Sequence, residues 1–211
     1  MKRIILILLL IFVSAWNWPT HESFSVKIYD SFPSEVKSNL NLTLVKEGSL
    51  IPDKIIQDYD KHSYPNSVER IDYWLTKSYD SYLEENYTLA SLSLGIASHY
   101  ISDSFSAPHN TANEDYSMHS KFETEAEGMP FYAQCTVGKK DVDAYISKAA
   151  VGKTDWGLWL RNKANKIQSK ELSKALYAGY ALSHAYYSSE CYQPLTSKIS
   201  NWFKAIRFRF S

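Results

Sequence analysis

Residues 94–103 read Leu94-Gly-Ile-Ala-Ser-His99-Tyr-Ile-Ser-Asp103. Small and apolar residues dominate this stretch and recur three and four positions apart, a pattern typical of a helix packed on its neighbours. Four residues make about one helical turn, so the side chains of His99 and Asp103 project from the same face. The stretch therefore predicts a helix that directs an imidazole and a carboxylate toward one point.

The same spacing recurs in His119-Ser-Lys-Phe-Glu123, and His109 lies between the two pairs at the start of a loop. Imidazole nitrogens and carboxylate oxygens together suit zinc. A single pair of this kind is common as a salt bridge on a helix surface, whereas two pairs with a histidine between them favour a metal site. His184 has no carboxylate within one turn and is expected to be a packed or surface histidine.

The remainder of the chain also has helical periodicity. Helices are expected near residues 22–45, 68–86, 87–105, 119–130, 140–151, 155–166, 169–187 and 193–207. Alternating strand patterns are scarce, and glycine and proline fall between the helical segments. The sequence predicts a compact, all-α, single-domain fold in which the long connections 46–67 and 106–118 carry function.

Composition and charge exclude several classes of protein. The 211 residues are 45% hydrophobic and contain only 7 Gly and 7 Pro, which argues against a disordered or collagen-like chain. The 23 basic residues are balanced by 23 acidic residues, so no summed positive field attracts a polyanion. Strong nucleic-acid binding is therefore not expected.

The first 15 residues have the pattern of a secretory signal peptide. A basic start at Met1-Lys-Arg is followed by an apolar run over residues 4–13 and by the small-residue ending Val13-Ser-Ala15. That run is much shorter than the roughly 20 residues of a membrane-spanning helix. We expect cleavage after residue 15, a mature domain of residues 16–211, and a secreted or extracytoplasmic protein.

Two features follow from export. Cys135 and Cys191 are the two cysteines, and they are free to form one disulfide in an oxidising compartment, the alternative being two buried thiols. Cleavage also frees an α-amine at Trp16, five residues before His21. A neutral amine binds a metal together with its own carbonyl oxygen, so Trp16 is a candidate chelator.

Together these residues resemble the zinc-dependent phospholipase C family, whose wider superfamily includes zinc-dependent single-strand nucleases. The resemblance runs in order over residues 16–123. It rests on Trp16 with His21, Gly48-Ser-Leu-Ile-Pro-Asp53, His62, Leu94-Gly-x-x-x-His99-Tyr-x-x-Asp103, Pro108-His109 and His119-x-Lys-Phe-Glu123.

The resemblance implies a cluster of three zinc ions in an all-α domain. It assigns one zinc to Asp53, His62, His99 and Asp103, and a second to His109, His119 and Glu123. The third zinc is assigned to the amine and carbonyl of Trp16, to His21, and to Asp103 as a bridging ligand.

Asp53 has a second expected role, as the group that accepts a proton from the attacking water. The interval between Asp53 and His62 is shorter than in the family, so Asp58 or Asp60 is an alternative ligand in its place. This choice is open at the level of sequence.

Three divalent ions suit phosphodiester hydrolysis, because the transition state accumulates charge on the phosphoryl oxygens. The motif forms favour a phospholipase C that releases diacylglycerol and a phosphorylated head group. The alternatives are a single-strand nuclease or nucleotidase and a non-catalytic, metal-stabilised helical protein. We expect a monomer that contacts membrane surfaces transiently. Residues 202–210, which mix aromatic and basic side chains, are either an interfacial segment or a packed final helix.

Overall fold

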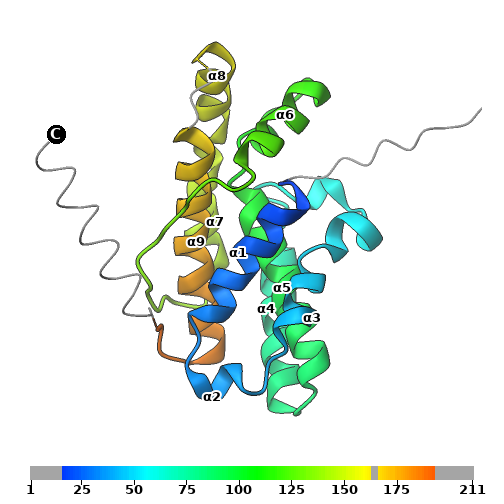
Figure 1. The fold of residues 1–211 in the computed structure, drawn as a ribbon, viewed down its shortest axis with the longest axis vertical. Coiled ribbons are helices and arrows are strands. Elements are labelled where there is room, and N and C mark those ends of the chain that lie inside the picture. The colour runs from blue at the N-terminus through cyan, green and yellow to red at the C-terminus, as the bar shows by residue number, and fades with distance from the viewer. Residues whose placement is uncertain (1–15, 163–165, 193–211) are drawn as a thin grey trace, which may run out of the picture.

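The computed structural model describes residues 16–162 and 166–192, and the regular secondary structure in this part of the chain is helical (Figure 1). The longer helices are α1 (Trp18–Asp30), α4 (Ser67–Leu83), α5 (Tyr87–Ser104), α6 (Tyr116–Ala126), α8 (Gly152–Asn162) and α9 (Lys166–Tyr187). Shorter elements are α2 (Ser34–Lys37), α3 (Leu42–Gly48), α7 (Val142–Ile146), the π-helical turn η1 (Pro52–Ile56) and the 3₁₀ turns η2 (Tyr59–Lys61), η3 (Pro108–Asn110) and η4 (Ser147–Val151). The all-α fold class expected from periodicity is confirmed.

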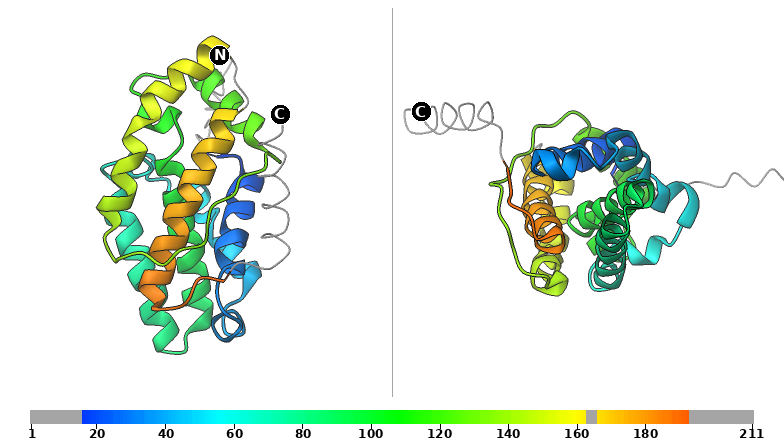
Figure 2. Two further views of the ribbon diagram at one scale, coloured as in Figure 1. Left: turned by 90° about the vertical axis from the view of Figure 1, so that its left-hand side faces the viewer. Right: turned by 90° about the horizontal axis from the view of Figure 1, so that it is seen from below.

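Helix α5 lies at the centre of the bundle. It contacts α1, α3, α4 and α9, and the two perpendicular views in Figure 2 show these neighbours arranged around it. From Ser93 to Ser104 every residue of α5 is buried. A helix enclosed on all sides has no polar face toward water, so its His99 and Asp103 lie in the interior of the protein.

The expected helix over residues 22–45 is wrong. The chain forms α1, α2 and α3 there instead, because Pro33 has no backbone N–H and its ring obstructs a continuing helix. Asn41 then caps α3 by accepting hydrogen bonds from the backbone N–H groups of Thr43 and Leu44. The interruption turns α3 back against α5.

Smaller differences occur at other helix ends. Helix α6 begins at Tyr116, three residues before His119, because Asp115 accepts a hydrogen bond from Met118 N–H and caps it. The segment expected over 140–151 divides into α7 and the 3₁₀ turn η4. The helix expected over 193–207 lies outside the described residues, as do residues 1–15.

Two glycines allow α3 and α5 to come unusually close. A Cβ atom on Gly48 would lie 2.2 Å from the carbonyl oxygen of Leu92, and one on Gly95 would lie 2.1 Å from that of Val45. Both distances are far inside van der Waals contact, so only glycine fits at this crossing. The close approach places the carbonyl oxygen of Ser49, just after α3, beside His99 on α5.

The connector, residues 127–141, has no helix and passes along α9 on its way from α6 to α7 (Figure 2). It is fastened by the expected disulfide, which links Cys135 to Cys191 with a Cα–Cα distance of 5.6 Å. Further along it, Gly138 N–H donates to the carbonyl oxygen of Ala181 on α9. Within the described part, no helix combines the length and the apolar character needed to cross a bilayer.

Candidate metal centre

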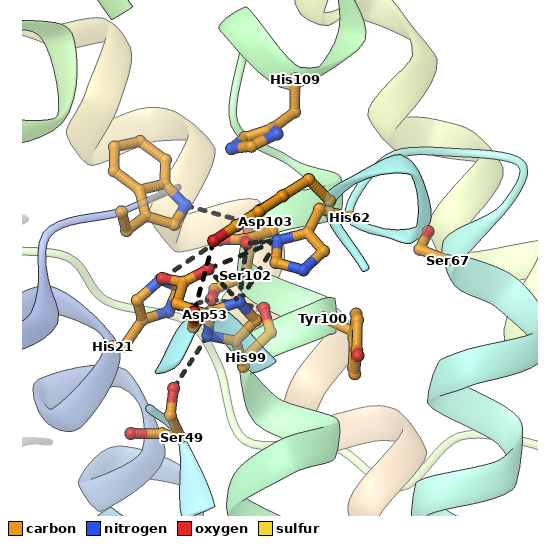
Figure 3. A network of polar contacts seen from close by, with 12 residues as sticks. His21, Ser49, Asp53, His62, Ser67, His99, Tyr100, Ser102, Asp103 and His109 are labelled. Carbon is orange, nitrogen blue, oxygen red and sulfur yellow. Dashed lines mark hydrogen bonds and ion pairs between the residues drawn. The ribbon is translucent and has the colours of Figure 1, made fainter. Parts of the chain in front are cut away.

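Five buried side chains converge around the end of α5, two from α5 itself and three from other parts of the chain (Figure 3). His99 and Asp103 come from α5 itself, His21 comes from α1, Asp53 comes from η1, and His62 follows η2. The i, i+4 spacing on α5 acts as expected, because His99 Nε2 lies 3.0 Å from Asp103 Oδ2. Four of the five, Asp53, His62, His99 and Asp103, place one nitrogen or oxygen each within 4.8 Å of one another.

The two oxygens of Asp103 face different histidines. His62 Nδ1 lies 2.8 Å from Oδ2, on the same side as His99, whereas His21 Nε2 lies 3.4 Å from Oδ1. Burial by itself raises the pKa of Asp103, but the neighbouring His99 and His21 outweigh burial and hold it well below its usual range. Asp103 is thus a buried carboxylate anion whose two oxygens face two separate sets of nitrogen atoms.

Hydrogen bonds on the outer side of His99 and His21 determine which nitrogen of each ring is available as a ligand. Ser49 O accepts from His99 Nδ1–H at 2.8 Å, so the Nε2 of a neutral His99 is an acceptor. Ser102 Oγ donates to the carbonyl oxygen of His99 and accepts from His21 Nδ1–H at 3.0 Å. When both imidazoles are neutral, as metal binding requires, their Nε2 atoms therefore present lone pairs toward Asp103.

This arrangement fits a cation. Lone pairs on His21 Nε2 and Asp103 Oδ1 face each other, and neither buried atom has a hydrogen-bond partner. Two acceptors at this distance repel one another in a low-dielectric interior unless a positive charge lies between them. A nitrogen and oxygen donor set of this composition is suited to zinc.

A second group lies next to the first and contains His109 from η3 with His119 and Glu123 from α6. His119 Nε2 is 2.5 Å from Glu123 Oε1, and His109 Nε2 is 3.6 Å from the same oxygen. Glu114 accepts from His119 Nδ1–H at 3.1 Å, which again leaves Nε2 facing inward. Burial raises the pKa of Glu123 well above its usual range, and the negative charge of Asp103 adds to this effect.

The two groups adjoin. The ring of His109 has its centroid 6.0 Å from that of His62 in the first group and 4.8 Å from that of His119 in the second. Trp16 closes the site from another direction, fully buried, with its indole N–H donating to the carbonyl oxygen of Ser102 at 3.0 Å. All nine residues expected in the metal site thus lie in one region of the protein.

The structure separates the three candidate aspartates near residue 53. Asp53 Oδ1 lies within the first group, 3.5 Å from His99 Nε2 and 3.8 Å from His62 Nδ1. Asp58 lies on the opposite side of His62, with Oδ1 3.6 Å from Nε2. Asp60 is exposed and paired with Lys61. The geometry therefore favours Asp53 as the carboxylate of the first group.

Asp58 has a supporting position that the sequence did not predict. Tyr100 donates its hydroxyl proton to Asp58 Oδ1 at 2.7 Å, and Arg70 Nε lies 2.8 Å from the other oxygen. These contacts hold the carboxylate behind His62, where it orients the ring. Ser49, Ser102 and Glu114 support the candidate ligand histidines in the same way, and the sequence analysis assigned none of them this role.

His184 is packed, in agreement with the expectation for that residue. It is fully buried between Ser31 Oγ and Ser189 Oγ, each 2.9 Å from a ring nitrogen, and lies near the Cys135–Cys191 disulfide. Burial lowers its pKa to about 4, so it is neutral at physiological pH. The sulfur atoms beside it are joined to each other, which leaves no thiolate there to bind a metal.

Zinc binding is predicted to release protons from this site. Burial lowers the pKa of His62, but hydrogen bonds to Asp103 and Asp58 outweigh it and raise the pKa from 6.5 to about 9 in the metal-free protein. The charged His62 therefore stabilises the metal-free fold fully below pH 6.5, and this contribution is lost as the pH rises to about 9. Zinc must displace the proton, so its affinity should increase over the same pH range.

Calorimetry of zinc binding at pH 7 in two buffers of different ionisation enthalpy measures this release. We expect His62→Gln to lower the number of protons released on zinc binding by about one. His184→Gln should leave this number unchanged, because His184 is already neutral. A zinc affinity that does not change between pH 6.5 and 9 contradicts the assignment of His62 as a ligand.

Comparison with known protein families agrees with this geometry. The model of the zinc-dependent phospholipase C family matches residues 20–189, a range that contains both groups of clustered histidines and carboxylates. Comparison with individually curated proteins found no significant match. The family match covers far more than half of the chain and supports zinc as the metal of the site. The chain belongs to the zinc-dependent phospholipase C family.

Proposed function

We propose that the protein is a phospholipase C that hydrolyses the phosphodiester of a glycerophospholipid to diacylglycerol and a phosphorylated head group. The main structural support is Asp103, a buried carboxylate whose two oxygens face separate sets of histidine nitrogens. A carboxylate in this position is suited to bridge two cations. The family match supports a lipid substrate over a nucleic acid, as does the absence of net positive charge.

The proposed ligand sets follow the two groups and the amino terminus. Asp53, His62, His99 and Asp103 would hold the first zinc, and His109, His119 and Glu123 would hold the second. His21 binds a third zinc through Nε2, together with Asp103 and the freed amine and carbonyl of Trp16. The burial of Trp16 against Ser102, whose hydroxyl also contacts His21, supports this third set.

Bound zinc ions offset the charge of the phosphodiester and lower the pKa of a nucleophilic water. Asp53 accepts a proton from that water as its oxygen forms a bond to phosphorus. The phosphorus–oxygen bond to glycerol breaks, the glycerol oxygen takes a proton from solvent water to give diacylglycerol, and Asp53 returns its proton to the solvent. Ser49, Ser102, Asp58 and Glu114 keep the histidine rings in their binding orientation throughout.

A small apolar and cationic surface beside Asp53 is suited to a bilayer. Ile55 is 72% exposed, Trp18 is 46% exposed, and Lys54 Nζ lies 3.9 Å from the centre of the Trp18 ring. Tryptophan and lysine side chains are favoured where hydrocarbon meets lipid head groups. We therefore place the transient membrane contact at this surface, Trp18–Lys54–Ile55. The other candidate for this contact, residues 202–210, lies outside the described residues.

The zinc-loaded protein should convert phosphatidylcholine vesicles to diacylglycerol and phosphocholine, as resolved by phosphorus NMR. Asp103→Asn should abolish turnover and lower the zinc content, because a neutral amide leaves the repulsion between two cations uncompensated. Asp60→Asn, which neutralises an exposed carboxylate, should leave both unchanged. Free choline, or mononucleotides from single-stranded DNA with lipid left intact, contradicts the proposal. Full zinc occupancy without either activity favours a non-catalytic metal protein.

The membrane contact predicts a substrate-dependent effect of Ile55→Ser. Loss of this apolar side chain should lower turnover of vesicles by about tenfold, since burial of one isoleucine contributes roughly 1.5–3 kcal/mol. Turnover of a soluble short-chain substrate should be unaffected. Leu83→Ser, at a similarly exposed leucine at the end of α4, is the matched control and should change neither rate.

The mature chain should begin at Trp16 and hold three zinc ions. Amino-terminal sequencing of the exported protein identifies the first residue, and elemental analysis gives the zinc content. A chain that retains residues 1–15 should bind one zinc fewer, because its Trp16 nitrogen is then an amide rather than an amine. A mature start at Trp18, or equal zinc content in the two forms, excludes the proposed amino-terminal ligand.

A further inference from the structure

A cavity of about 470 Å³ lies outside the metal centre, between α9, η4 and the connector. None of the clustered histidines or carboxylates lines it. Its walls are almost entirely apolar and include Phe105 at the end of α5, Ala133 of the connector, and Tyr177 and Ala178 of α9. Cavities of about this size, lined mainly by apolar side chains, are typical of small-molecule binding sites.

The charged side chains that line the cavity are all lysines, Lys148, Lys170 and Lys174. Asp155 lies 3.3 Å from Lys170 Nζ and 3.9 Å from Lys174 Nζ, so one carboxylate is shared by two of the three ammonium groups. Glu171 is also close, but its buried carboxylate accepts from Ala107 N–H, and burial raises its pKa well above the usual range. The entrance to an apolar cavity therefore carries excess positive charge.

The outer wall of the cavity is fastened in place. Ser169 donates to the carbonyl oxygen of Pro130 at 2.5 Å, and Tyr132 N–H donates to Ser173 Oγ at 3.1 Å. Cys135, which follows the lining residue Gln134, is joined to Cys191. These bonds hold the connector against α9 next to the residues that line the cavity. A site formed before its ligand arrives loses little affinity to ordering of the chain.

From the apolar wall and the lysines at its edge, we infer that this cavity binds a long-chain fatty acid. The hydrocarbon chain lies among Phe105, Tyr177 and Ala178. The carboxylate lies at Lys170 and Lys174, where it supplies a second negative charge beside that of Asp155. The cavity volume suits one acyl chain rather than the two chains of a diacylglycerol or phospholipid. Neither the metal centre nor the membrane surface takes part in this site.

The test compares oleate with oleyl alcohol, which has the same chain and no charge, on the zinc-loaded protein below the micelle concentration of either ligand. Calorimetry should show one saturable oleate site and binding of the alcohol that is weaker by about tenfold or more, because the uncharged hydroxyl cannot form charge-assisted hydrogen bonds with the lysines. Equal affinity for the two ligands, or no saturable binding of oleate, overturns the inference.

Variants locate the site. The double variant Lys170→Gln/Lys174→Gln should weaken oleate binding by about tenfold or more, whereas Lys121→Gln, at an exposed lysine on α6, should not change it. Ile55→Ser should leave oleate binding intact, so binding at the membrane surface is distinguished from binding in the cavity. Unchanged affinity in the lysine variant overturns the inference. None of these measurements depends on hydrolysis, so failure of the proposed phospholipase activity leaves the test valid.

Discussion

The burial of Asp103 is the constraint around which the fold is arranged. A carboxylate anion in the protein interior is strongly disfavoured unless cations or hydrogen-bond donors surround it. Here the surrounding groups come from α1, from the turns after α3, and from α5 itself, and outer hydrogen bonds turn the inner nitrogens of His21 and His99 into acceptors. The site is therefore complementary to metal ions, and metal binding is coupled to the stability of the helices that meet there.

The packing of α5 against its neighbours explains how the side chains of this buried site are held in place. Gly48 and Gly95 bring two backbones together so that the Ser49 carbonyl reaches His99, and Ser102 connects His21 with the indole of Trp16. Small side chains thus do two things at once, because they permit close packing and supply the hydrogen bonds that orient ligands. Without these hydrogen bonds and a bound cation, nothing would offset the desolvation of the buried carboxylates and imidazoles, and the helix bundle would be less stable.

Lipid chemistry connects the three functional regions that we propose. Lys54 and Ile55 of the proposed membrane surface, Trp18–Lys54–Ile55, directly follow Asp53 in the chain. A bilayer bound at this surface would therefore lie next to the metal centre. The lysine-edged cavity is lined by Phe105, directly after α5, and by residues of the connector, which the disulfide fastens to Cys191 beyond the end of α9. The proposed phospholipase would encounter fatty acids at lipid surfaces. The proposed cavity would bind them at a site separate from the metal centre.

Local spacing in the sequence was sufficient to predict the all-α fold and the two histidine–carboxylate pairs, because i, i+4 contacts are decided within one helical turn. His109 and the freed amine of Trp16 were also candidates from the sequence itself, and resemblance to the family supplied Asp53, His62 and the ligand role of His21. The break of residues 22–45 into three helices has a local cause, Pro33, which helical periodicity alone does not reveal. The placement of Asp53 rather than Asp58 in the first group, and the contacts of Ser49 and Ser102 with the histidines, were decided by tertiary structure. Each depends on contacts between segments far apart in the chain, such as the approach of α3 to α5, and helical periodicity carries no information about such distances.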